Sequence, residues 1–283
     1  MSYCKSAITK AFLPGYNLSF LHTTDQMDHK KWISEGKYKF FIASERDIPD
    51  LISFVQKNFL DYEPIMRNIG IMAGTSILDR YLRIEMCKRL VTDLIIHAGG
   101  TPSCVVARST IDDSILGCRM GKVVSRKEAR NKSDPHLSCV GNILSYLPIP
   151  LKSNHMLNMK RLYKDLKYGQ VHAFNELKDA NKIYFASNVC VSAKARGLGL
   201  GSELVRRGYT IAKQYGCDYT YILASSMYSQ HKFHKLGNCQ ILHQVRYKDY
   251  RFDKHGRPFL INTNEHKVIQ VVAIRHISDS IYG

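Results

Sequence analysis

The stretch VSAKARGLGLGS, from Val191 to Ser202, carries the strongest signal in the chain. It ends an apolar segment typical of a strand, Lys182–Val191, and leads directly into a segment with helical spacing, Ser202–Tyr215. Glycines at alternate positions let the backbone take positive φ angles and let a ligand approach the main chain closely. The free N–H groups at the start of the helix then attract a phosphate. We predict a strand–loop–helix unit that binds a pyrophosphate.

The glycine spacing separates this loop from two common nucleotide-binding loops. A dinucleotide fingerprint needs G-x-G-x-x-G, whereas the spacing here is G-x-G-x-G. A P-loop needs Lys and then Ser or Thr after its last glycine, but Gly201 is followed by Ser202 and Glu203. Arg196 adds a positive charge at the mouth of the loop. A turn that binds no ligand is the alternative for this segment.

Strand and helix patterns alternate along the chain from residue 37 onward. The predicted strands are 37–43, 103–109, 114–124, 182–191, 219–224, 241–247 and 268–276. The predicted helices are 48–59, 76–94, 156–166, 171–177, 202–215 and a short one from Ser225 or Ser226 to Leu236. The pattern predicts a mixed α/β fold in which helices cover a sheet around one core. We expect residues 1–36 to be an N-terminal extension and residues 37–283 to be a single domain with a basic insertion around 126–181.

Charge and composition restrict the classes of protein to which this chain can belong. The 283 residues include 41 Lys and Arg against 24 Asp and Glu, a net charge of +17, and most of the excess lies in residues 100–283. A basic surface favours anionic partners, but without a run of five or six cations we expect no specific nucleic-acid site. Hydrophobic residues make up 45% of the chain, and no apolar run is as long as a membrane span. These features predict a soluble, cytoplasmic globular protein.

The cysteines and histidines give little sign of a metal site. The eight cysteines show no C-x-x-C spacing and are predicted to be free thiols. His231 and His234 lie three residues apart on a predicted helix, a spacing that could hold a metal. Two surface histidines beside a basic stretch explain the pair as well. Since no third ligand is near them in the sequence, we predict no metal site.

The glycine loop resembles the acetyl-coenzyme A signature of the GNAT N-acetyltransferase superfamily. That signature is R-G-x-G-x-G after a strand that ends in V-x-V, here Val189-Cys190-Val191. Two more segments, FLDYEPI at 59–65 and LASSMYS at 223–229, are similar to the invertebrate arylalkylamine N-acetyltransferases, which acetylate dopamine and serotonin. The resemblance covers roughly Lys37 to His276. It implies a GNAT-like fold with a mostly antiparallel, twisted sheet that is flanked by helices and split near the acetyl-CoA site.

The resemblance also implies roles for single residues. Glu63 would be the general base that deprotonates the substrate ammonium, and Ser225 and Ser229 would relay a proton or protonate the departing coenzyme A thiolate. A bulged backbone at Cys190–Val191 would hold the thioester carbonyl. The pyrophosphate would lie against Arg196, Gly197, Leu198, Gly199, Leu200, Gly201 and Ser202. The apolar and aromatic neighbours of Glu63 agree with a raised carboxyl pKa.

Each catalytic assignment has a structural alternative. Glu63 could cap a helix end or pair with Arg67, and the serines could cap the helix that follows them. Three places depart from the family pattern, and one of them is Asn238, where a hydrophobic residue usually follows Leu-Gly. The general-acid tyrosine of many members is replaced by Phe233, and the Pro-His pair of the branch reads Glu265-His266.

The predicted activity is transfer of an acetyl group from acetyl-CoA to a small primary amine. An arylalkylamine such as dopamine, tyramine, serotonin or octopamine is the first candidate, and the nearly neutral first third, which contains Glu63, suits a cationic amine. Protein, peptide or polyamine acceptors are the second hypothesis, although a surface of net charge +17 would repel a polycation. A non-catalytic module that binds coenzyme A is the third.

Overall fold

The structure is a computed structural model, and it describes residues 38–60, 62–68, 77–96, 102–131, 154–251 and 265–276. All of them lie in one compact unit, Tyr38–Gly283. The predicted extension, residues 1–36, lies outside the described residues, as do residues 132–153 of the basic segment. Among the described helices, none is long and apolar enough to cross a lipid bilayer.

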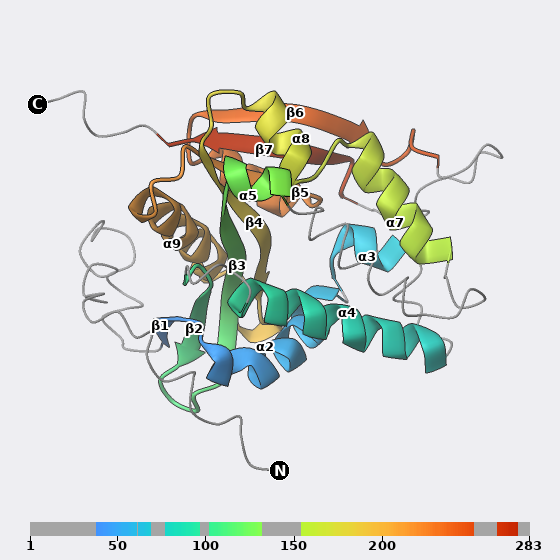
Figure 1. Cartoon of the computed structure of the whole chain (residues 1–283). Helices are drawn as coiled ribbons and strands as arrows, with labels where there is room; N and C mark the ends of the chain where they lie inside the picture. The colour runs from blue at the N-terminus through green and yellow to red at the C-terminus, as the bar shows by residue number, and fades with distance from the viewer. Residues whose placement is uncertain are drawn as a thin grey trace, which may run out of the picture. The chain divides into compact units, whose positions relative to one another are not determined.

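A seven-stranded sheet in the order β1-β2-β3-β4-β5-β7-β6 forms the centre of this unit (Figure 1). Its strands are β1 (Tyr38–Ile42), β2 (Val105–Ser109), β3 (Ile115–Ser125), β4 (Lys182–Val191), β5 (Tyr219–Ala224), β6 (Cys239–Arg246) and β7 (Val268–Arg275). Neighbouring strands are antiparallel except β4 and β5, which are parallel. The predicted mixed α/β fold with a mostly antiparallel sheet is confirmed.

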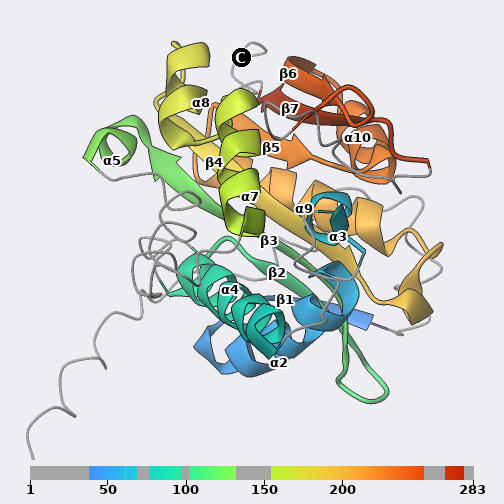
Figure 2. The ribbon, with the colours of Figure 1, turned by 90° about the vertical axis from the view of Figure 1, so that its right-hand side faces the viewer.

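Helices cover both faces of the sheet. They are η2 (Glu45–Asp47), α2 (Ile48–Val55), the π-helical turn η3 (Gln56–Leu60), α3 (Pro64–Asn68), α4 (Ile77–Ile95), α5 (Arg126–Asn131), α7 (Asn154–Asp165), α8 (Gln170–Glu176), η5 (Ala193–Ala195), α9 (Leu200–Gln214) and α10 (Met227–His234). One face carries α9 and α10. The other carries α2, α4 and α7, and Figure 2 shows the molecule from the side of α4 and α7.

The sheet opens between its two parallel strands. Residues Ile183–Ala186 of β4 pair with Tyr219–Ile222 of β5. Beyond Ala186, β4 continues to Val191 and pairs with β3 alone in the described register. The expected split of the sheet is therefore present, and it begins five residues before the end of β4.

A β-bulge marks the start of this opening. The register between β3 and β4 shifts between Met120 and Gly121, which leaves Ser187 of β4 without a partner residue. The bulge therefore lies at Ser187 and not at Cys190–Val191, where the sequence analysis expects it. A bulge bends its strand and increases the local twist, so the end of β4 turns away from β5 at this point.

The two sides of the sheet have separate cores. On the α9 side, Tyr184 packs with Val205 and Phe233. On the other side one cluster lies under α2 and α4, and another includes α7 and α8. Leu162 and Leu166 of the basic segment are fully buried in that second cluster. The segment is thus part of the core as well as a source of surface charge.

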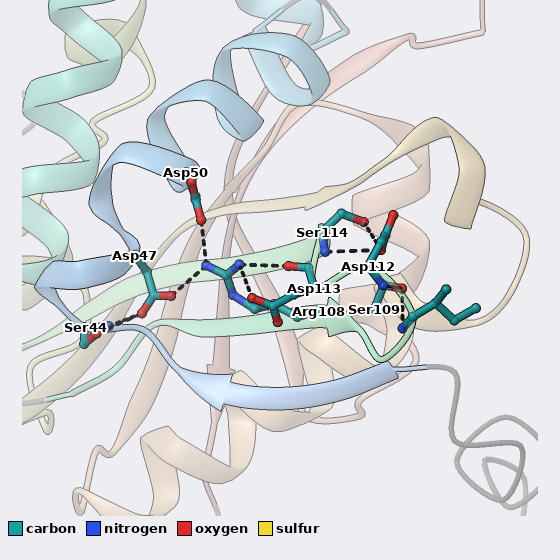
Figure 3. Close-up of polar contacts among 9 residues, drawn as sticks. Ser44, Asp47, Asp50, Arg108, Ser109, Asp112, Asp113 and Ser114 are labelled. Atoms are coloured by element: carbon teal, nitrogen blue, oxygen red, sulfur yellow. Dashed lines mark hydrogen bonds and ion pairs between the residues drawn. The ribbon is translucent and has the colours of Figure 1, made fainter.

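An arginine joins α2 to the β2–β3 hairpin (Figure 3). A capping box precedes α2, since the backbone N–H and the hydroxyl of Ser44 both donate to Asp47 Oδ2 at 2.9 Å. Arg108 Nη2 donates to Asp47 Oδ1 at 2.9 Å and to Asp50 Oδ2 at 3.0 Å, while its Nη1 donates to the Asp113 carbonyl at 2.9 Å. These bonds fix the direction in which the chain enters α2 and then η3.

Candidate active site

The glycine loop has the backbone that its sequence predicts. Gly197 has φ +79° and Gly199 has φ +78°, both in the left-handed region that favours glycine. Gly199 is the N-cap of α9, which therefore begins at Leu200, two residues earlier than expected. A Cβ atom at either glycine would meet nothing within 4 Å. The loop is therefore open to a ligand, and its glycines are needed for backbone angle.

A lysine from α10 reaches the start of α9. Lys232 Nζ lies 3.4 Å from Ser202 Oγ, and its Cε would be 3.2 Å from a Cβ atom at Gly201. Burial, with a smaller effect of the neighbouring Lys235, lowers the pKa of Lys232. The Lys232 ammonium places a positive charge beside the free N–H groups at the start of α9. These groups together fit the pyrophosphate of a coenzyme. No pattern in the sequence links Lys232 to a loop thirty residues earlier.

Arg196 connects the glycine loop to the segment that contains Glu63. Its guanidinium carbon lies 4.3 Å from the ring centroid of Tyr62, the residue before Glu63, in a cation–π contact. The short helix η5, which precedes the glycine loop, contacts the β2–β3 hairpin, because Lys194 Nζ lies 2.8 Å from Ser114 Oγ. The loop and the Glu63 segment are therefore in contact, although they lie far apart in the sequence.

Glu63 is buried, with 9% of its surface exposed, at the start of α3. The N–H of Met66 donates to its Oε2 at 2.6 Å, and the N–H of Ile65 and the hydroxyl of Ser225 also bond to the carboxylate. Burial raises the pKa of Glu63, and these three hydrogen bonds offset part of that increase. The carboxylate therefore both caps α3 and contacts Ser225.

The three serines before and within α10 have different partners. Ser225 bonds to Glu63, whereas Ser226 is the N-cap of α10, and its Oγ accepts from the N–H of Ser229 at 3.2 Å. The Ser229 hydroxyl donates to the Ser226 carbonyl at 2.8 Å. The structure thus brings together Glu63 and Ser225 and directs Ser229 to the start of the helix.

Tyr247 completes this cluster and has no signal in the sequence beyond its place at the end of a predicted strand. Its side chain is 1% exposed, and its hydroxyl donates to the Ser225 carbonyl at 2.7 Å. Burial, and to a smaller extent the charge of Glu63, raises the pKa of Tyr247. Tyr247 is therefore a protonated donor that holds the backbone beside the Glu63–Ser225 pair.

The other residues predicted to bind the coenzyme differ in exposure. Leu200 is buried against the sheet, and Leu198 is exposed. Val189 packs toward the α9 core, while Cys190 is buried on the opposite side, where burial raises the pKa of its thiol to about 12. In the part of the chain that the structure describes, no group of three His, Cys, Asp or Glu side chains is arranged to hold a metal.

Comparison with known proteins finds chains of similar fold and one matching family model. Residues 163–237 match the sequence model of the acetyltransferase (GNAT) family. Arylalkylamine N-acetyltransferase 2 of Aedes aegypti is 17% identical over 84% of this chain and 98% of its own, with a TM-score of 0.65. A polyamine N-acetyltransferase of Drosophila melanogaster that forms N-acetylagmatine is 15% identical over 84% of this chain and 100% of its own, with a TM-score of 0.59. Comparison with curated protein sequences gives no significant match.

The chain therefore has the GNAT fold, and its residues 163–237 resemble the acetyltransferases of that family in sequence. Among them, the chain resembles the insect arylalkylamine N-acetyltransferases in fold. The resemblance and the fold class predicted from the sequence are both confirmed.

Proposed function

We propose that this chain transfers an acetyl group from acetyl-CoA to a small primary amine, with an arylalkylamine such as dopamine, tyramine, serotonin or octopamine as the first candidate. The observation that carries the proposal is the buried Glu63 carboxylate, which accepts a hydrogen bond from Ser225. A carboxylate with a raised pKa is a suitable base for an ammonium group. The name of one insect structural neighbour supports an arylalkylamine as acceptor, and the name of another supports the polyamine hypothesis through agmatine.

Acetyl-CoA would supply the acyl group as a thioester. Its pyrophosphate would be held by the N–H groups at the start of α9 and by Lys232, with Arg196 at the mouth of the loop. The edge of β4 that separates from β5 after Ala186 offers backbone groups to the acyl end. In this proposal the coenzyme would lie beside Glu63, because Arg196 contacts Tyr62.

In this mechanism Glu63 takes one proton from the substrate ammonium, and Ser225 holds the carboxylate in position. The freed nitrogen attacks the acyl carbon, a C–N bond forms, and the C–S bond breaks. The second proton lost by nitrogen leaves with the coenzyme A thiolate. We assign the proton relay to Ser225, and assign Ser226 and Ser229 to the start of α10. Transfer is direct, and the Cys190 thiol, with a pKa of about 12, is a poor nucleophile at neutral pH.

A panel of amines tests the proposal. The protein is incubated with acetyl-CoA and one amine at a time, and release of free thiol is followed with a colorimetric reagent. We expect turnover of dopamine, tyramine or serotonin and none of spermine or a lysine peptide, which a surface of net charge +17 disfavours. Turnover of agmatine or spermine alone would support the polyamine hypothesis. Calorimetric binding of acetyl-CoA without turnover of any amine would support a binding module.

A further inference from the structure

The side-chain amide of Asn188 is buried without a hydrogen-bond partner. Asn188 is 3% exposed, and neither its Nδ2 nor its Oδ1 has a partner among the described residues. Nearly all buried polar groups in native proteins are paired, because an unpaired one loses its bonds to water and gains none in return. An amide in this condition is therefore a candidate contact for a ligand.

The strand register shows which face of the sheet carries this amide. Asn188 pairs with Met120 of β3, and paired residues of an antiparallel ladder project to the same face. Met120 is fully buried in the core under α2 and α4, together with Leu51 and Cys87. The Asn188 side chain therefore lies on that face, and not on the face that α9 covers.

The same amide borders the opening between β4 and β5. Asn188 comes two residues after Ala186, the last residue of β4 that pairs with β5, and Ser225 comes three residues after Ile222, the partner of Ala186. The two residues thus stand on opposite sides of the opening. Because Ser225 bonds to Glu63 and η3 packs against β4, the Glu63 carboxylate lies at this opening as well.

We propose that Asn188 binds the acceptor amine. Its Oδ1 accepts one N–H of the amine nitrogen and holds that nitrogen beside Glu63, which takes a second proton from it and so frees the lone pair that attacks the acyl carbon. A primary amine has enough N–H groups for both contacts. This assignment rests on the proposed function and adds a second polar contact to its acceptor site.

The Asn188→Leu variant tests the assignment, because leucine keeps the branching of the side chain and removes both polar atoms. We expect the KM for the preferred amine to rise at least 10-fold and the KM for acetyl-CoA to stay within 2-fold. We also expect the thermal midpoint to stay the same or rise, because a buried unpaired amide is removed. If the leucine variant does not fold, the Asn188→Ala variant, which adds no atoms, tests the same assignment.

Thr220→Val is the matched control. Thr220 is a buried polar residue of β5 on the α9 face, and its Oγ1 lies 2.8 Å from His276 Nε2. The Thr220→Val variant should have a lower thermal midpoint and unchanged KM values.

A folded Asn188 variant with the KM of the wild type for the amine would overturn the assignment and leave the proposed function intact. Equal rises in both KM values would assign Asn188 a structural role instead. Lack of turnover by the wild type with every amine would reject the proposed function, and this assignment with it.

Discussion

Glu63 shows how one residue acquires two roles from its position. Its carboxylate accepts from the N–H of Met66 at 2.6 Å, as a helix cap does, and it also bonds to Ser225. Burial disfavours the ionised form and raises the pKa of Glu63 above the ordinary value of 4.5. A carboxylate that holds its proton more strongly is a better proton acceptor from an ammonium group. In the proposed reaction, the helix cap would keep this carboxylate in place while it accepts the proton.

The first prediction follows from the direction of that pKa shift. A general base must be ionised, so kcat/KM of the wild type should fall as the pH falls through a pKa above 4.5. The Glu63→Gln variant should lower kcat by roughly 10²- to 10⁴-fold and lose this acid limb. The measurement is a pH–rate profile with the preferred amine. Glu85→Gln, on α4 next to Arg89, is the control and should keep the wild-type profile. Full activity of Glu63→Gln across the pH range would remove Glu63 as the base.

Sequence patterns identify only part of the site at this scale. Glu63 and Ser225 lie in segments that resemble known motifs, and the structure brings these two residues together. Tyr247, Lys232 and Asn188 belong to no motif. Their proposed roles in the site depend on neighbours from other elements, such as the Ser225 carbonyl, which accepts a hydrogen bond from Tyr247. The sequence around each of these residues gives no indication of those contacts.

At the scale of elements, the unit formed by β4, the glycine loop and α9 is predicted closely. β4 and β5 have the predicted bounds, because apolar strands that end in glycine or polar turns are marked at both ends. α9 begins earlier than predicted because Gly199, in the left-handed conformation, is already the N-cap. The bulge at Ser187 is not predictable locally, since it depends on how β4 aligns with β3.

The second prediction concerns the contact between α10 and α9. Lys232 Nζ lies beside Ser202 at the start of α9, so the Lys232→Met variant should weaken acetyl-CoA binding by about 10-fold, or about 1.4 kcal/mol. Titration calorimetry measures this. The Lys235→Met variant removes an exposed lysine from the end of the same helix and should bind almost as the wild type does. Equal affinities for both variants would show that Lys232 does not contact the coenzyme.

At the scale of the whole molecule, the charge is distributed unevenly along the chain. Most of the net charge of +17 comes from residues 100–283, which include the glycine loop and α9. The nearly neutral first third supplies β1, α2, η3 and α3, and with them Glu63. The long-range field should therefore act on an anionic coenzyme more strongly than on a small cationic amine at a buried carboxylate.

The third prediction is a difference in salt dependence between the two substrates. An increase from 50 to 200 mM salt should raise the KM for acetyl-CoA about 3-fold, since mobile ions screen exposed charges over about 10 Å. The KM for the amine should change less, because Glu63 is buried. Initial rates at several salt concentrations measure both values. An equal change in both would show that the surface charge does not favour the coenzyme.

The sequence alone determined the features that depend on near neighbours: the strand and helix periods, the glycine loop before α9, and the capping box at Ser44 and Asp47. Tertiary structure alone decided where the sheet opens, and that Glu63, Ser225 and Tyr247 meet there. Periodicity and turn chemistry act over a few residues, so they can be read along the chain. The burial that raises the pKa of Glu63 comes from elements distant in sequence, and it exists only when they pack together.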